Sequence, residues 1–262
     1  MTLSATEISK EKYLELVMKA RMEGRSVQNG RAFLYKFNAG EFQIFYECRK
    51  RPIWAMYKIH KGNEITKDMR YFKSYQPRDG CGLKNKSAYS PYYQNNRIIY
   101  YKPAPLISPE VMSNNEGVMI AKSMLNIAPQ SIILGFSGIG YAEDMERCIK
   151  RTGGELLVIT GTVESDKRNN IQKEGLTPDY IYKILIRGGS AGFEYQSWLF
   201  PNDDTLVTSI VNDYMVSIEK IMSISRWPLP QEVGMYITKS NQKTIPEPWL
   251  DVWHECGESV RF

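Results

Sequence analysis

The chain has 262 residues and a formal net charge of +5, with 42% hydrophobic and 24% charged residues. This length accommodates one large domain or two small ones, and the composition is ordinary for a globular protein. These values exclude a largely disordered chain, and no apolar run approaches the ~20 residues that a membrane-spanning helix needs.

The first predicted element is a short amphipathic helix from Lys12 to Arg25, where apolar residues recur at helical spacing before Gly24. Strands are predicted at 42–46 and 53–59, since both stretches are rich in aromatic and branched residues. The following stretch, 61–97, contains several glycines and prolines and is predicted to be a long loop region.

The second half of the chain is predicted to be strand-rich after a short helix at 115–125. Residues 156–160 form an apolar, β-branched run bounded by glycines, which predicts a buried strand. Two further strands are predicted at 181–186 and 195–200. The glycine-rich turn 188–192 lies between them and lacks the lysine and spacing of a phosphate-binding loop, so it predicts a hairpin.

From Pro228 onwards, prolines predict an extended arm that carries Trp249 and Trp253. These tryptophans either pack back on the domain, the commoner use of such side chains, or anchor a partner protein.

Basic charge is concentrated between Arg49 and Lys102, where thirteen lysines and arginines face three acids and alternate with tyrosines. Basic side chains neutralise phosphates and aromatic rings stack on unpaired bases, so this segment favours nucleic-acid binding. The alternative is a basic loop region that only keeps a β-rich domain in solution. The candidate residues are Arg49, Lys50, Arg51, Lys73, Arg78, Lys84, Lys86, Arg97 and Lys102, with Arg147 and Lys183 further along the chain.

The four cysteines, Cys48, Cys81, Cys148 and Cys256, are widely scattered and lack the paired spacing of a structural zinc site. We therefore expect free thiols in a reducing compartment. The first twelve residues mix acids with bases, unlike an acid-poor transit peptide. Cytoplasm or nucleus is the expected location.

The most informative stretch is 124–162. An Asn-Xaa-Xaa-Pro-Gln block begins at Asn126, an amphipathic segment with Glu146 and Arg147 follows, and a strand-like run ends in Thr160-Gly161. This order resembles the DNA/RNA non-specific endonucleases of the endonuclease G type. Further similar stretches are 42–57, 177–186, 198–202 and 216–221.

The resemblance implies an α+β fold of the ββα-metal nuclease type, with a central antiparallel sheet flanked by helices. It assigns an endonuclease G-like domain to residues 30–230. An N-terminal helical extension (1–29) precedes this domain and a C-terminal extended arm (231–262) follows it.

The resemblance also indicates that the family's chemistry is missing. Its Asp-Arg-Gly-His signature falls near residues 101–104, with Ala104 in place of the histidine base that takes a proton from water. The chain contains only two histidines, His60 and His254, and neither is near this position in sequence.

The family's metal-binding asparagine falls on Gly135, and the acidic helix residue falls on Glu146, with Glu143 as the alternative. A lone glutamate on a charged helix face is more often solvated than a metal ligand. We therefore predict no metal site and no cofactor. The degenerate site positions are Lys102, Ala104, Asn126, Gly135 and Glu146.

Two functions follow as hypotheses for an inactive pseudo-endonuclease: binding of DNA or RNA with little sequence preference, or binding of a protein partner. The resemblance implies a homodimer, or a heterodimer with a related protein, and no membrane partner. The alternative is a residually active Mg²⁺-dependent endonuclease that uses Tyr101, Lys102 or Glu146 as its base.

Overall fold

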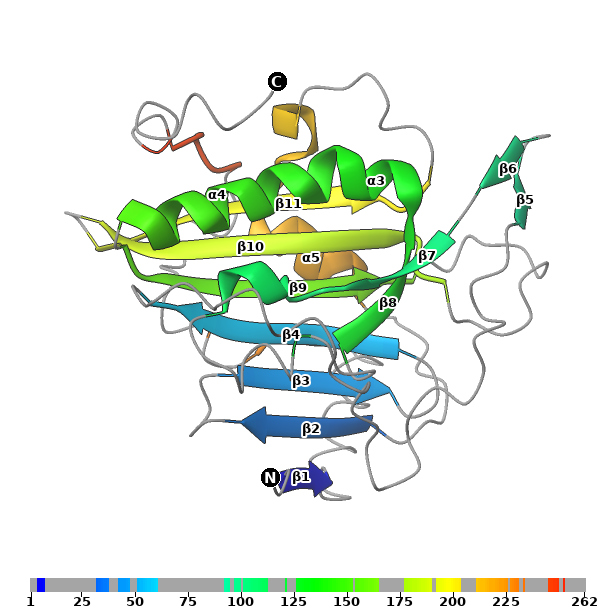
Figure 1. Ribbon diagram of the computed structural model, residues 1–262, viewed down its shortest axis with the longest axis horizontal. Helices are drawn as coiled ribbons and strands as arrows, with labels where there is room; N and C mark the ends of the chain where they lie inside the picture. The colour runs from blue at the N-terminus through cyan, green and yellow to red at the C-terminus, as the bar shows by residue number, and fades with distance from the viewer. Residues whose placement is uncertain are drawn as a thin grey trace.

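A computed structural model describes the backbone of residues 4–7, 32–37, 42–47, 51–60, 92–94, 97–99, 101–112, 121, 126–152, 154–164, 177–189, 192–203, 211–225, 227–230, 233, 245–249 and 252. Its main feature is a seven-stranded sheet in which every pairing is antiparallel (Figure 1). In spatial order the strands are β1 (Ser4–Glu7), β2 (Ala32–Phe37), β3 (Phe42–Glu47), β4 (Arg51–Ile59), β9 (Leu156–Val163), β10 (Tyr180–Gly189) and β11 (Gly192–Pro201).

Strands β3, β4 and β9 are buried on nearly their whole length on both faces, and the sheet carries one long helix on one face and a short helix on the other. Helix α4 (Gly138–Thr152) lies across the front of the sheet in Figure 1, and α5 (Ile218–Ile224) lies behind it. Side chains alternate between the faces of a strand. In β9, Leu156 and Val158 therefore join the core under α4, whereas Leu157 joins the core on the α5 side.

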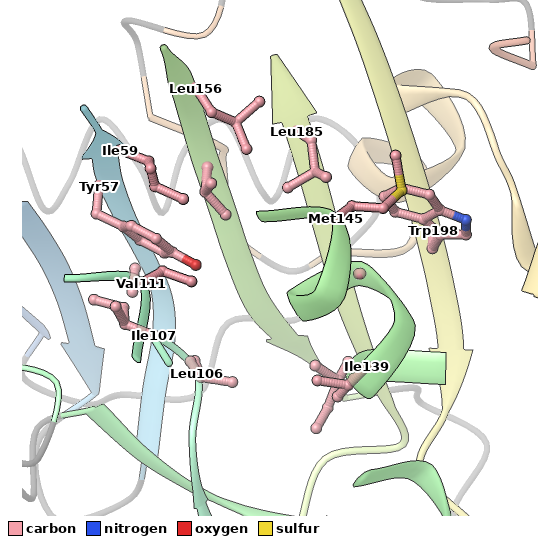
Figure 2. Packing of buried hydrophobic residues seen from close by; sticks show 14 of the residues in the cluster. Tyr57, Ile59, Leu106, Ile107, Val111, Ile139, Met145, Leu156, Leu185 and Trp198 are labelled. Carbon is pink, nitrogen blue, oxygen red and sulfur yellow. The ribbon is translucent and has the colours of Figure 1, made fainter. Parts of the chain in front are cut away.

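The core under α4 joins apolar residues from five strands of the sheet, β3, β4, β9, β10 and β11, to one face of the helix. Figure 2 shows Tyr57, Leu156, Leu185 and Trp198 projecting from the sheet toward the side on which Met145 of α4 lies. The other contributors from α4 recur at helical spacing and are Ile139, Tyr141, Ala142, Cys148 and Ile149.

Two smaller strand pairs flank the main sheet. Strand β7 (Tyr101–Pro105) pairs with β8 (Ile127–Ser131), and β8 leads through the short helix α3 (Ile132–Phe136) into α4. Strands β5 (Tyr92–Gln94) and β6 (Arg97–Ile99) form a hairpin. Two 3₁₀ helices, η3 (Pro109–Val111) and η6 (Val211–Tyr214), complete the elements of the described residues.

Gly161 allows β9 to pass close to both of its neighbours. A Cβ atom at this position would lie 2.6 Å from the carbonyl oxygen of Ile53 and would clash with the ring of Tyr182. Only glycine fits between a backbone carbonyl and an aromatic ring at this separation. The glycine that marks the end of the predicted strand is therefore needed inside β9.

The α+β architecture predicted from the sequence is confirmed, as are all five predicted strands and the hairpin between β10 and β11. The predicted loop region differs at its end, where β5 and β6 pair. Strand β1 lies in the N-terminal extension that was expected to be helical. The predicted helix 12–25 lies outside the described residues, and of the predicted helix 115–125 only Ala121 is described, in a helical conformation.

The described part of the C-terminal arm, residues 233, 245–249 and 252, packs on the domain. Trp249 is only 5% exposed and belongs to the core under α4, and the guanidinium carbon of Arg187 lies 4.3 Å from its ring centroid. Gln196 Nε2 also donates to the carbonyl oxygen of Glu247 at 3.2 Å. The packing expectation is confirmed for Trp249, while Trp253 lies outside the described residues.

The expectation of free thiols is wrong for Cys148. This residue is buried on α4 and is disulfide-bonded, and the other three cysteines lie outside the described residues. Disulfides persist mainly in oxidising compartments. Cys148 therefore gives no support to the reducing compartment expected from the sequence.

Candidate functional site

The expected catalytic region lies where β7, β8 and α4 meet. Ala104 on β7 pairs with Ala128 on β8, and both are buried methyl side chains. Lys102 pairs with Gln130 and is half-buried. Gly135 lies in α3 and offers only backbone atoms. The position assigned to the general base thus carries a methyl group within a strand pair.

The side chain of Asn126, at the start of the motif that carries the resemblance, forms hydrogen bonds with backbone groups of two other segments. Its Oδ1 accepts from the amide of Ile107 at 3.1 Å. Its Nδ2 donates to the carbonyls of Ile107 at 3.1 Å and Ala121 at 2.7 Å. Because both ends of the buried amide are used, Asn126 fixes the segment after β7 and has no free oxygen for a metal.

Asn202, directly after β11, ties both small strands to the main sheet. Its Oδ1 accepts from the amide of Ser131, and its Nδ2 donates to the carbonyls of Pro129 and Pro178. Its own carbonyl accepts from the hydroxyl of Tyr101 at 2.8 Å. This role of Asn202 was not predicted from the sequence, where the only signal was the resemblance of the Pro201-Asn202 strand end.

Glu146 is fully buried beneath α4, with an exposed fraction of 0%. One carboxylate oxygen accepts from the Lys183 ammonium, and the other accepts from the Tyr57 hydroxyl at 2.6 Å. Lys183 is 1% exposed and Tyr57 is 0% exposed. We call these three residues the buried triad; it links α4 to β10 and β4 across the intervening strand β9.

The buried triad overturns two expectations from the sequence. Glu146 is not a solvated residue, since its helix face packs on the sheet. Lys183 cannot contact a phosphate, because its ammonium is enclosed and bound to Glu146. The pKa of Tyr57 is raised well above its usual value because burial and then the neighbouring Glu146 and Glu143 carboxylates disfavour the phenolate. Tyr57 is therefore a neutral donor.

Arg147, the next residue on α4, lies at the surface between two carboxylates. Its Nη1 is 2.9 Å from Glu110 Oε2 on η3, and its Nη2 contacts Asp144 Oδ1 one helical turn earlier. Lys150 Nζ donates to the carbonyl of Met112 at 2.7 Å, so the η3 segment is held along this side of the helix.

A family model for the DNA/RNA non-specific endonucleases matches residues 29–227. The chain belongs to this family. No individually curated protein matches it.

The endonuclease domain match ends at residue 227, so the arm that carries Trp249 lies beyond it. The family's metal is a hard cation held by oxygen atoms. The positions assigned to the metal do not fit it, because Gly135 lacks a side-chain oxygen and both oxygens of Glu146 are engaged. Within the part of the chain that the structure describes, no group of three or more His, Cys, Asp and Glu could hold a metal ion.

His60 lies far from the expected position of the base. Its Nδ1 is 3.4 Å from Glu155 Oε1, beside the first residue of β9. The expected catalytic region, which includes the start of α4, lies near the other end of β9. Gly138, the first residue of α4, packs on Phe200, and Phe200 is level with Thr162 near the end of β9. At ~3.3 Å per residue these ends of β9 are roughly 20 Å apart. His254 lies outside the described residues.

The structure places few of the basic candidates. Arg51 is buried at the start of β4, and its Nη2 lies 2.8 Å from Glu164 Oε2. Its charge is thus compensated inside the domain. Only the backbone of Arg97 is described, in β6. Arg49, Lys50, Lys73, Arg78, Lys84 and Lys86 lie outside the described residues. Among the residues that are described, no helix could span a membrane.

Glu143, the alternative acidic position on α4, is half-buried close to the buried triad. Burial raises its pKa; Lys183 and Arg147 oppose this rise, and Glu146 and Glu110 add to it. A raised carboxyl pKa in the folded state contributes stability below the unfolded pKa, and that contribution is lost as pH rises through the folded pKa.

We therefore expect Glu143→Gln to be more stable than the wild type at neutral pH, with the difference disappearing below about pH 4, where the unfolded carboxyl is also protonated. Urea denaturation of both proteins across pH measures this difference. Glu247→Gln is the matched control, since Glu247 is exposed in the arm. A Glu143→Gln gain that stays constant with pH would contradict the expectation.

Proposed function

We propose that this endonuclease-family protein binds DNA or RNA without cutting it. The observation that carries the proposal is the buried triad. Glu146 stands at the family's acidic helix position, and its two carboxylate oxygens accept hydrogen bonds from Lys183 and Tyr57. Ala104 and Gly135 support it, because neither can replace a base or a metal ligand.

The missing groups account for most of the chemistry of such an enzyme. A general base contributes ~10²- to 10⁴-fold to the rate of proton abstraction. A divalent cation stabilises the charge that develops on the phosphoryl oxygens. With both lost, the domain is left with its capacity to attract and hold a polyanion, which depends on basic side chains rather than on the site.

The segment from Arg49 to Lys102 supplies that capacity, with its excess of lysines and arginines and its tyrosines. Phosphate contacts supply affinity without sequence preference, and aromatic faces accept any base. We therefore expect the protein to bind DNA or RNA with little sequence preference.

Two single substitutions test this binding surface. We expect Lys50→Gln, which removes a charge directly before β4, to weaken binding and to reduce the salt slope by about 0.7–0.9 for one lost phosphate contact. The control is Lys220→Gln, because Lys220 is exposed on α5 and lies outside the segment from Arg49 to Lys102. Fluorescence anisotropy with single- and double-stranded oligonucleotides across salt concentrations measures both effects.

An equal loss for both variants would mean that binding depends on net charge rather than on this surface. Failure of the wild type to bind any nucleic acid would contradict the proposal and favour a protein-binding role, as a homodimer or as a heterodimer with a related chain. Mg²⁺-dependent cutting would favour the active alternative.

A further inference from the structure

We infer that Glu110 is an internal competitor for the phosphate-binding face of Arg147 and so limits the affinity of this protein for nucleic acid. The inference rests on the proposed function, since it names a residue that regulates the same binding activity. It starts from the surface ion pairs that Arg147 forms with Glu110 and Asp144.

Arg147 is accessible to a ligand, but its guanidinium already pairs with two carboxylates. Its side chain is 32% exposed and that of Glu110 is 70% exposed, so the pair lies at the surface. Guanidinium groups offer a planar fork of donors that fits carboxylate and phosphate oxygens alike. A phosphate that approaches Arg147 therefore meets a guanidinium whose Nη1 already donates to Glu110.

The strength of the pair suits a competitor rather than a permanent block. Exposed ion pairs contribute little to stability, because water and salt screen them and ordering the side chains has an entropic cost. A nucleic-acid backbone presents phosphates at high local density. These phosphates can displace Glu110 from Arg147. Because the Glu110–Arg147 pair must break first, the net affinity is lower than it would be without Glu110.

Glu110 differs from the other acids that face Arg147. Asp144 lies on the same helix, one turn away, and Glu143 also lies on α4 and acts on Arg147 through charge. Glu110 instead comes from η3, a separate segment. The removable carboxylate is thus the one that reaches Arg147 from outside the helix.

The backbone of η3 is held by contacts that do not involve the Glu110 side chain. Val111 and Met112 are buried, and the carbonyl of Met112 accepts from Lys150. Asn126 binds both backbone groups of Ile107 just upstream. Neutralising Glu110 should therefore remove its charge without moving the segment.

The test measures affinity for a fluorescent single-stranded DNA and the same sequence in RNA across salt concentrations. We expect Glu110→Gln to bind about two- to fivefold more tightly than the wild type, the range that an exposed ion pair allows. We also expect its salt slope to be steeper by ~0.7, for one phosphate gained on a single strand.

The matched control is Glu194→Gln. Glu194 is also exposed and pairs with an arginine, Arg187, at 2.9 Å, but it lies on the β10–β11 hairpin. This variant changes net charge equally and also removes a carboxylate from an arginine. The second control is the double variant Glu110→Gln/Arg147→Gln, which should bind no better than Arg147→Gln alone.

Three results would overturn the inference while leaving the proposed function intact: wild-type binding with no gain in Glu110→Gln, an equal gain in Glu194→Gln, or a gain that persists without Arg147. If neither the wild type nor Glu110→Gln binds, the proposed function and the inference both fail.

Discussion

Replacing Lys183 with methionine should lower the free energy of unfolding by about 3–5 kcal/mol, the usual cost of leaving one member of a buried ion pair without its partner. Glu146 would keep only the Tyr57 hydroxyl in a site from which water is excluded. Urea denaturation followed by circular dichroism measures the loss. The effect is large against the 5–15 kcal/mol that typically stabilises a domain.

The control is the double variant Lys183→Met/Glu146→Met, which replaces the whole ion pair with apolar side chains. Such replacements are often neutral or stabilising, because they also remove the desolvation cost of both charges. We expect the double variant to recover most of the lost stability. A single variant within about 1 kcal/mol of the wild type would mean that Lys183 and Glu146 do not form an enclosed pair.

Replacing Trp249 with alanine should also be costly, by about 3–5 kcal/mol, because a large buried aromatic side chain leaves a cavity when it is truncated. The substitution also removes the ring over which Arg187 lies. Thermal or urea denaturation measures the change, and a cooperative loss would show that the arm folds with the endonuclease domain.

Ile245→Ala is the matched control within the arm. Ile245 is 66% exposed, so we expect a change within about 0.5 kcal/mol. If Trp249→Ala were equally mild, the arm would contribute little to the core and its tryptophan would be available for a partner.

The strands were predictable because their signals are local. The apolar run 156–160 lies between glycines and is buried on both faces, as the fully apolar pattern indicates. The glycine turn 188–192 predicts a hairpin from its composition alone, and β10 and β11 do pair through it. Helix α4 was placed by resemblance, which carries information from the whole family.

The buried triad was not predictable from one sequence. Tyr57 and Glu146 are 89 positions apart, and Glu146 and Lys183 are 37 apart. The sequence around a lysine in a strand or a glutamate on a helix does not indicate that its side chain is buried. Each residue taken alone is expected to be exposed to solvent. No local pattern predicted the hydrogen bonds of the Asn202 side chain, since its partners are backbone groups 24 to 73 positions away.

We propose that this endonuclease-family protein binds nucleic acid and leaves it intact. The most direct test is incubation with supercoiled plasmid and with single-stranded RNA, with and without Mg²⁺, across salt concentrations, scoring both retention and cleavage on gels. An active member of the family serves as the positive control. We expect salt-sensitive binding with unchanged substrate at every Mg²⁺ concentration. Cutting that requires Mg²⁺ and stops on chelation would contradict the claim.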